Sequence, residues 1–220
     1  MSIELLLVDL DGTLVDSFDD IQQGMTVALD AIGVPATAEL LALSRRGVSL
    51  EIYYRHALAR DPADPDEHAR FSAFVDSYVG HYEAHPHSAR VYDGVHDTLT
   101  ELGRRRPGLR MAVATNKRTD LARDLLTRAG LAGFFDIIQG SETVAKKPDP
   151  AILLLIARQL EIDIRRAIMV GDSGADVQAA QSAGCGAVAV TYGGWPRHEI
   201  EALGPDRLID RFSDLLDIVA

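Results

Sequence analysis

Short apolar runs that alternate with helix-like segments constrain the fold of this chain more than any other feature. Five of these runs have the length of buried strands, and they lie at residues 3–9, 109–115, 135–139, 166–171 and 185–191, with a further short strand expected at 207–209. Amphipathic segments between them predict helices at 94–106, 118–129, 149–161 and 175–183. Near-continuous apolar strands separated by helices are typical of parallel sheets that helices cover on both faces. The pattern predicts an α/β fold with a doubly wound, Rossmann-like parallel sheet.

The stretch after the first strand does not follow this alternation. Residues 16–89 contain no strand-like run and predict four helices, at about 18–32, 38–45, 49–60 and 66–84. We therefore expect two domains. Residues 1–15 and 90–220 form the α/β core, and residues 16–89 form an all-helical insert.

Composition excludes several kinds of partner. The chain has 220 residues, of which 47% are hydrophobic, and a net charge of −11. A nucleic-acid partner would need a basic surface, so none is expected. No apolar run approaches the ~18 residues that span a bilayer, and the first residues do not resemble a secretory signal. The single cysteine, Cys185, excludes an internal disulfide bond. A cytoplasmic location without membrane contact is expected.

Two aspartates end the first predicted strand, in the segment DLDGTLVDS that begins at Asp9. Asp9 and Asp11 are two residues apart, so their side chains share a face if the strand continues. In doubly wound folds, ligands bind beyond the carboxyl ends of the strands. Paired carboxylates at such a place suit a divalent cation, or a division of work between a nucleophile and an acid–base group. A helix cap followed by a turn is the structural alternative.

Polar residues also follow the later strands. Thr115, Asn116 and Lys117 come after the second run, where a hydroxyl and N–H groups at a helix start can hold phosphate. Asp172 follows the 166–171 run, and Asp176 comes four residues later, in the first turn of the next predicted helix. Each of these residues is also an ordinary helix-capping or first-turn residue, so none of them alone defines a site.

Lysine is rare in this chain. Only three of its 22 basic residues are lysines, and they are Lys117, Lys146 and Lys147. In a chain that uses arginine at most basic positions, a lysine can be required for its compact ammonium group. Lys147 precedes Pro148-Asp149-Pro150, where a cation could neutralise clustered carboxylates and phosphate oxygens.

Together these segments resemble the four motifs of the haloacid-dehalogenase-like phosphatase superfamily. DLDGTLVDS is similar to the first motif, TNK to the second, KPDP to the third and GDSGAD to the fourth, and they occur in the family's order. The TNK form resembles the phosphoglycolate-phosphatase-like branch. The resemblance implies that the helical insert is a cap domain of the C1 type and that the protein is a phosphoric monoester hydrolase.

The resemblance also implies a mechanism. Asp9 would attack phosphorus to form an aspartyl-phosphate, and Asp11 would act as general acid and then as general base. Mg²⁺ would be held by Asp9, the main-chain carbonyl of Asp11 and Asp172, while Asp176 orients groups around it. The groups that would hold the phosphoryl oxygens are Gly12, Thr115, Asn116 and Lys147.

Substrate choice in relatives of this type comes from the cap. Arg45 and Arg46, just before Gly47, could bind a substrate carboxylate, or they could be solvated cations at a helix end. A small phosphorylated metabolite, with 2-phosphoglycolate as the best candidate, fits the first interpretation. Sugar phosphates, nucleotides and pyrophosphate remain open as substrates.

Two other functions share part of this pattern. A phosphosugar mutase uses the same four motifs but returns the phosphoryl group to its substrate. A phospho-receiver signalling module also combines an acidic pair, a threonine and a lysine on a doubly wound fold, although its phosphorylated aspartate ends a middle strand of the chain. The oligomeric state is left open between a monomer and a homodimer.

Overall fold

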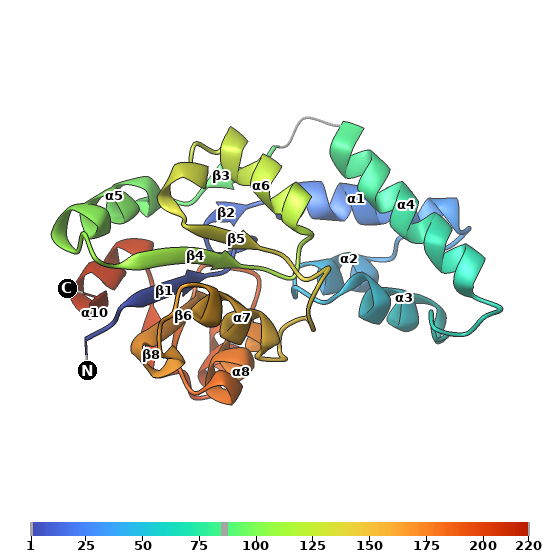
Figure 1. Cartoon of the computed structure of the whole chain (residues 1–220). Coiled ribbons are helices and arrows are strands. Elements are labelled where there is room, and N and C mark those ends of the chain that lie inside the picture. Colours follow the sequence, from blue (N-terminus) through green and yellow to red (C-terminus); the bar gives the residue numbers. More distant parts are fainter. Residues whose placement is uncertain (1, 85–87, 220) are drawn as a thin grey trace. The chain divides into compact units, whose positions relative to one another are not determined.

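A parallel sheet of six strands is the centre of the structure, a computed structural model that describes residues 2–84 and 88–219 (Figure 1). The strand order is β5-β4-β1-β6-β7-β8, and each neighbouring pair is parallel. The strands are β1 (Leu5–Val8), β4 (Arg110–Ala114), β5 (Ile137–Gln139), β6 (Ala167–Gly171), β7 (Gly186–Val190) and β8 (Arg207–Ile209). All six lie within or close to the predicted ranges, so the predicted α/β fold is confirmed.

Alternate side chains of these strands face opposite layers of helices. Leu5 and Leu7 of β1 pack into one apolar cluster with side chains of α7 (Ala151–Gln159) and α8 (Gly174–Ala183). Leu6 and Val8 are equally buried but do not belong to that cluster. On the other side of the sheet in Figure 1 lie α5 (Val95–Arg105) and α6 (Thr119–Arg128). Burial of β1 on both faces explains its uninterrupted apolar sequence.

The chain divides into two compact units. One contains Met1–Asp16 and Arg90–Ala220, and the other contains Ser17–Ala89. A small antiparallel ribbon of β2 (Val15–Asp16) and β3 (Arg90–Val91) lies in the first unit, where the chain leaves and returns. Two-residue strands carry too little periodicity to be predicted from sequence, and this ribbon was not expected.

The described residues of the second unit form four helices, as the sequence predicts. They are α1 (Phe18–Ala31), α2 (Ala38–Ser44), α3 (Leu50–Leu58) and α4 (His68–Ala84). The hydroxyl groups of Thr37 and Ser49 cap α2 and α3 by accepting main-chain N–H groups. Asp20 of α1 accepts hydrogen bonds from Ser88 N–H and Oγ at 2.9 and 2.6 Å, which joins the two ends of the unit.

Among the described residues of the first unit, five further short helical elements are present, of which three are 3-10 helices. They include α9 (Arg197–Glu201) and α10 (Leu215–Val219), which were not predicted. Among residues 2–84 and 88–219, no helix has both the length and the apolar character that crossing a bilayer requires.

Candidate active site

Predicted site residues from three strands lie close together at the carboxyl ends of those strands, because the strands are neighbours in the sheet. β1 lies between β4 and β6, and all three run in the same direction. The residues that follow them are Asp9, Thr115 and Asp172, so parallel strand geometry brings three segments distant in sequence to one place. The Asp9 N–H donates to the Val170 carbonyl at 2.9 Å, which extends the pairing of β1 and β6 by one residue to Asp9.

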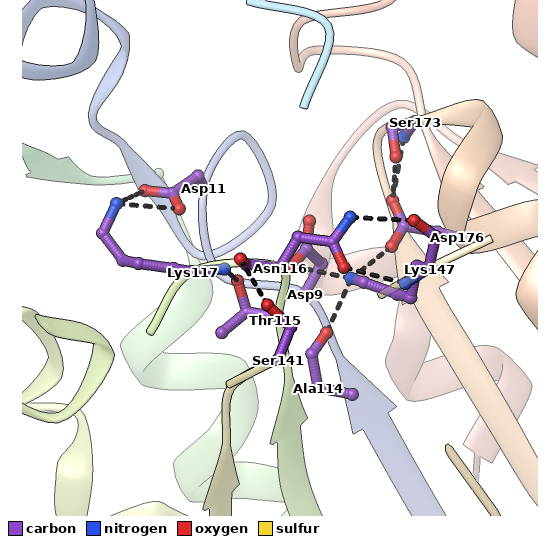
Figure 2. Close-up of polar contacts among 10 residues, drawn as sticks. All are labelled: Asp9, Asp11, Ala114, Thr115, Asn116, Lys117, Ser141, Lys147, Ser173 and Asp176. Atoms are coloured by element: carbon purple, nitrogen blue, oxygen red, sulfur yellow. Dashed lines mark hydrogen bonds and ion pairs between the residues drawn. The ribbon is translucent and has the colours of Figure 1, made fainter. Parts of the chain in front are cut away.

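A buried ammonium group lies at the centre of the site. Lys147 Nζ lies 2.6 Å from Asp176 Oδ1, 2.9 Å from Asp9 Oδ1 and 2.6 Å from the Ala114 carbonyl oxygen (Figure 2). The side chains of Lys147 and Asp176 are each 2% exposed. Ser173 donates to Asp176 Oδ2 from Oγ at 2.6 Å and from its N–H at 3.0 Å. Asp176 is thereby fixed from both sides and holds Lys147 in place.

The charges in this cluster shift one another's protonation. Burial raises the pKa of the Asp9 carboxyl to about 7, against the lowering effect of the Lys147 ammonium. Burial and the carboxylates of Asp176 and Asp9 raise the pKa of Asp172 well above its usual range. Burial lowers the pKa of Lys147, but the carboxylates of Asp176 and Asp9 outweigh burial and hold it above the usual value. Lys147 is therefore a permanent positive charge at neutral pH.

The carboxylates at these strand ends have the chemistry of a site for a hard metal ion. Oxygen atoms of Asp9, Asp172 and Asp176 lie within 4.8 Å of one another. Both oxygens of Asp176 already accept hydrogen bonds, whereas the buried Asp9 Oδ1 has no partner with hydrogen-bond geometry among the described residues, despite its ion pair with Lys147. A buried carboxylate oxygen with unused lone pairs suits a divalent cation with oxygen ligands. Asp9 and Asp172 thus fit such an ion.

Asp11 lies apart from this cluster and has a different partner. Both of its carboxylate oxygens lie 3.0 Å from Lys117 Nζ, and Figure 2 shows this pair separated from the cluster around Lys147. The sequence noted Lys117 as one of three lysines but assigned it no contact. Two signals in the sequence pointed to Lys117, the scarcity of lysine and its place in the TNK segment.

Asn116 acts in this structure through its side chain. Asn116 Oδ1 accepts from the Lys147 N–H at 2.8 Å, and Nδ2 donates to the Lys147 carbonyl at 3.0 Å. The Lys147–Pro148 peptide bond is cis. Thr115, 2% exposed, accepts the Lys117 N–H at Oγ1 at 3.2 Å. The sequence predicted main-chain groups at Asn116 as phosphate ligands, and it missed this side-chain link to the lysine loop.

Gly12 brings its backbone close to Asp172. A Cβ atom at Gly12 would lie 2.3 Å from Asp172 Oδ2, and its φ of 81° is in the left-handed region that favours glycine. The Gly12 N–H, which was predicted to bind phosphate, donates instead to the Val15 carbonyl at 2.8 Å within the turn.

The loop after β7 supports Asp172 from another side, although the sequence assigned it no chemistry. The Gly194 N–H donates to Asp172 Oδ2 at 2.5 Å. A Cβ atom at Gly193 would lie 2.2 Å from Asp172 Cβ. Tyr192 donates from its hydroxyl to the Thr13 carbonyl at 2.9 Å, which ties this loop to the segment that follows Asp11.

The two predicted cap arginines belong to the helical unit. Arg45 is the C-terminal cap residue of α2, and its guanidinium lies 4.4 Å from the centre of the Phe18 ring. The Arg46 N–H donates to the Leu43 carbonyl at 3.0 Å. These contacts lie within the helical unit, so contact of either arginine with a substrate stays a prediction.

Comparison with known proteins identifies the family of this chain. Residues 6–190 match the family described as haloacid dehalogenase-like hydrolase. The chain is 34% identical to a phosphoglycolate phosphatase of Vibrio parahaemolyticus, over 99% of this chain and 96% of that protein. It is 36% identical to a phosphoglycolate phosphatase of Pseudomonas putida, over 96% of this chain and 78% of that protein.

A solved structure has the same fold over the whole chain. It is described as a predicted phosphoglycolate phosphatase from Haemophilus somnus and superimposes with a TM-score of 0.85 and 29% identity, covering 100% of this chain and 99% of that chain. The chain therefore belongs to the haloacid dehalogenase-like hydrolase family. The family and the enzyme class predicted from the four motifs are confirmed.

Proposed function

We propose that this protein is a Mg²⁺-dependent phosphomonoester hydrolase that works through an aspartyl-phosphate on Asp9. The observation that carries the proposal is the position of Asp9. Its carboxylate lies at the end of the central strand, has an unbonded buried oxygen and is 2.9 Å from the Lys147 ammonium. A nucleophile in such a place needs a neighbouring cation, because its target is an anionic phosphoryl group.

The reaction then has two steps. In the first, an Asp9 oxygen attacks phosphorus, the bond from phosphorus to the ester oxygen breaks, and Asp11 gives its proton to that oxygen. In the second, Asp11 takes a proton from water as the water attacks phosphorus. The bond between phosphorus and Asp9 breaks, and inorganic phosphate leaves with Asp9 restored.

Side-chain and main-chain groups at the carboxyl ends of the same strands hold the phosphoryl oxygens. Lys147 offers its charge, and Thr115 and the Asn116 N–H offer hydrogen bonds where β4 ends. Gly12 contributes through the close approach that its missing side chain allows. Asp176 keeps the Lys147 ammonium directed toward Asp9.

The carboxylates of Asp9 and Asp172, with the main-chain carbonyl of Asp11, would hold Mg²⁺. When bound, the ion neutralises charge on the phosphoryl group and fixes its orientation for in-line attack. Four carboxylates, those of Asp9, Asp11, Asp172 and Asp176, face two ammonium groups in this region. The excess of negative charge favours a divalent cation.

We propose 2-phosphoglycolate as the substrate, with the helical unit Ser17–Ala89 as a cap domain of the C1 type. Two kinds of observation support this. The relatives of 34% and 36% identity are named phosphoglycolate phosphatases. The helical unit also carries Arg45 and Arg46, which could pair with a substrate carboxylate. A cytoplasmic location and a monomeric or homodimeric state complete the proposal.

Phosphate release from a panel of esters tests this function. The panel contains 2-phosphoglycolate, sugar phosphates, nucleotides and pyrophosphate, each with Mg²⁺ or with EDTA. We expect release that requires Mg²⁺ and is fastest with 2-phosphoglycolate. Equal rates in EDTA would contradict the metal requirement, and formation of an isomer without free phosphate would indicate a mutase.

Asp9→Asn tests the nucleophile. We expect kcat to fall by roughly 10⁴-fold or more, because the amide cannot form the covalent intermediate. Asp97→Asn is the matched control, since its carboxylate is 97% exposed on α5. Mass spectrometry of acid-quenched wild type should find one phosphoryl group on the peptide that contains Asp9. An active Asp9→Asn enzyme would disprove the scheme.

A further inference from the structure

The ion pair between Lys117 and Asp11 places a cation beside the proposed acid–base group. Lys117 Nζ is equidistant from the two Asp11 oxygens, at 3.0 Å from each. The residues are 106 positions apart in sequence, and both belong to the α/β unit. This contact therefore does not depend on where the helical unit lies.

The main chain around Lys117 is fixed on both sides. Its N–H donates to Thr115 Oγ1 at 3.2 Å, and its carbonyl accepts the Ser141 N–H at 3.3 Å. A Cβ atom at Gly140 would lie 2.4 Å from the Lys117 carbonyl oxygen, so the two loops touch closely. The Lys117 side chain therefore begins from a preorganised position, which limits the entropy lost when its ammonium binds an anion.

Lys147 is already committed to other partners. Its ammonium group donates hydrogen bonds to Asp176 and the Ala114 carbonyl and forms an ion pair with Asp9. A substrate that carries a second anionic group beside its phosphate needs another cation. Lys117 is the lysine that touches Asp11, the residue proposed to protonate the ester oxygen.

The chemistry of the proposed substrate defines where its second charge lies. In 2-phosphoglycolate a single methylene separates the ester oxygen from the carboxylate. When Asp11 contacts that oxygen, the carboxylate is held within a few ångströms of Asp11. It then lies in the region that the Lys117 ammonium occupies.

On the basis of the proposed function, we propose that Lys117 binds the carboxylate of a 2-phosphohydroxy acid and sets the specificity of this site. The substrate carboxylate replaces Asp11 as the partner of Lys117. Asp11 is thereby released toward the ester oxygen. Esters without an anion one carbon from the ester oxygen cannot make this exchange, which disfavours them.

Three esters separate carboxylate binding from acid catalysis. 2-Phosphoglycolate has the carboxylate and an alkoxide leaving group, and ethyl phosphate has a similar leaving group without the carboxylate. p-Nitrophenyl phosphate has a leaving group that needs little protonation. The variant is Lys117→Met, which keeps the length and removes the charge. Lys146→Met is the matched control, and thermal unfolding shows whether each variant is folded.

We expect Lys117→Met to lower kcat/KM for 2-phosphoglycolate by about 10- to 100-fold, the effect of one charge-assisted contact. The kcat/KM values for ethyl phosphate and p-nitrophenyl phosphate should change by less than about threefold, because neither ester has a carboxylate for Lys117 to bind. Equal losses on both alkyl esters, with p-nitrophenyl phosphate unaffected, would mean that Lys117 only positions Asp11. That result, or no loss with any ester, would overturn the proposal.

Binding gives a second measurement that does not require turnover. In the Asp9→Asn background, calorimetry with Mg²⁺ should detect 2-phosphoglycolate, and adding Lys117→Met should weaken its binding by a similar factor. If wild type cleaves no ester, the proposed function fails, yet this binding result still decides the contribution of Lys117. Unchanged binding in the double variant would overturn the carboxylate site.

Discussion

Asn116 and Lys147 hold each other through two reciprocal hydrogen bonds. The Asn116 side-chain oxygen accepts the Lys147 N–H at 2.8 Å, and its amide nitrogen donates to the Lys147 carbonyl at 3.0 Å. The loop after β4 thereby fixes the main chain from which the buried ammonium group extends. The contact joins the segments predicted as the second and third motifs.

Removing this amide should loosen the lysine loop. We expect Asn116→Ala to lower the free energy of unfolding by about 1–3 kcal/mol, the range for two hydrogen bonds. kcat should fall as well, because the ammonium loses its fixed origin. Asn116→Asp keeps the acceptor for the Lys147 N–H and should lose less stability in urea unfolding. Equal stability of wild type and Asn116→Ala would contradict a structural contribution from the pair.

Lys147→Met should destabilise the metal-free protein. The substitution leaves the carboxylates of Asp9 and Asp176 buried without their cation, a loss of about 3–5 kcal/mol for broken buried ion pairs. Phosphatase activity should disappear in the same variant. Urea unfolding in EDTA measures the stability effect, with Lys146→Met as the control that removes a neighbouring lysine. A Lys147→Met protein as stable as this control would show that the buried charges do not require Lys147.

Gly193→Ala should weaken metal binding. The added Cβ would lie 2.2 Å from Asp172 Cβ, so Asp172 or the loop must move. Moving the groups that hold a metal ligand in position lowers the affinity for the metal by about 10- to 100-fold. Calorimetric titration with Mg²⁺ measures this change.

Gly103→Ala is the control for that substitution. Gly103 lies on α5, and apart from its chain neighbours and its own helix backbone no heavy atom of the described residues lies within 4 Å of the position that a Cβ would take. Alanine should stabilise the helix by about 0.5–1 kcal/mol and leave metal affinity unchanged. Weaker metal binding in Gly103→Ala would show that the effect at Gly193 is not local.

Metal affinity should depend on pH because a proton competes for Asp9. Burial raises the pKa of Asp9 to about 7, so the metal-free protein carries this proton at lower pH. A metal ion binds the ionised carboxylate and releases the proton. Apparent affinity should therefore rise as the pH increases from 5 through about 7. Calorimetry in buffers of different ionisation enthalpy measures the protons released, and a constant affinity across this range would contradict the prediction.

Local pattern was enough to predict the six strands of the parallel sheet and the position of each motif. Leu5–Val8 reads as a fully buried strand because all four side chains are apolar, and Asp9 follows because charge cannot continue into that core. The same reasoning placed Thr115 and Asp172 at strand ends. Four predicted helices in the insert are present because their apolar spacing and the caps at Thr37 and Ser49 are local properties.

Which side chains of the site pair with one another could not be predicted from local sequence pattern. Lys117 pairs with Asp11 across 106 residues, and Asn116 pairs with Lys147 across 31. Gly194 donates to Asp172 from a loop to which the sequence assigned no chemistry. Periodicity and motif spacing describe which residues reach the sheet edge. Which side chains meet there depends on distances between loops from separate strands, and those distances exist only after the sheet has assembled.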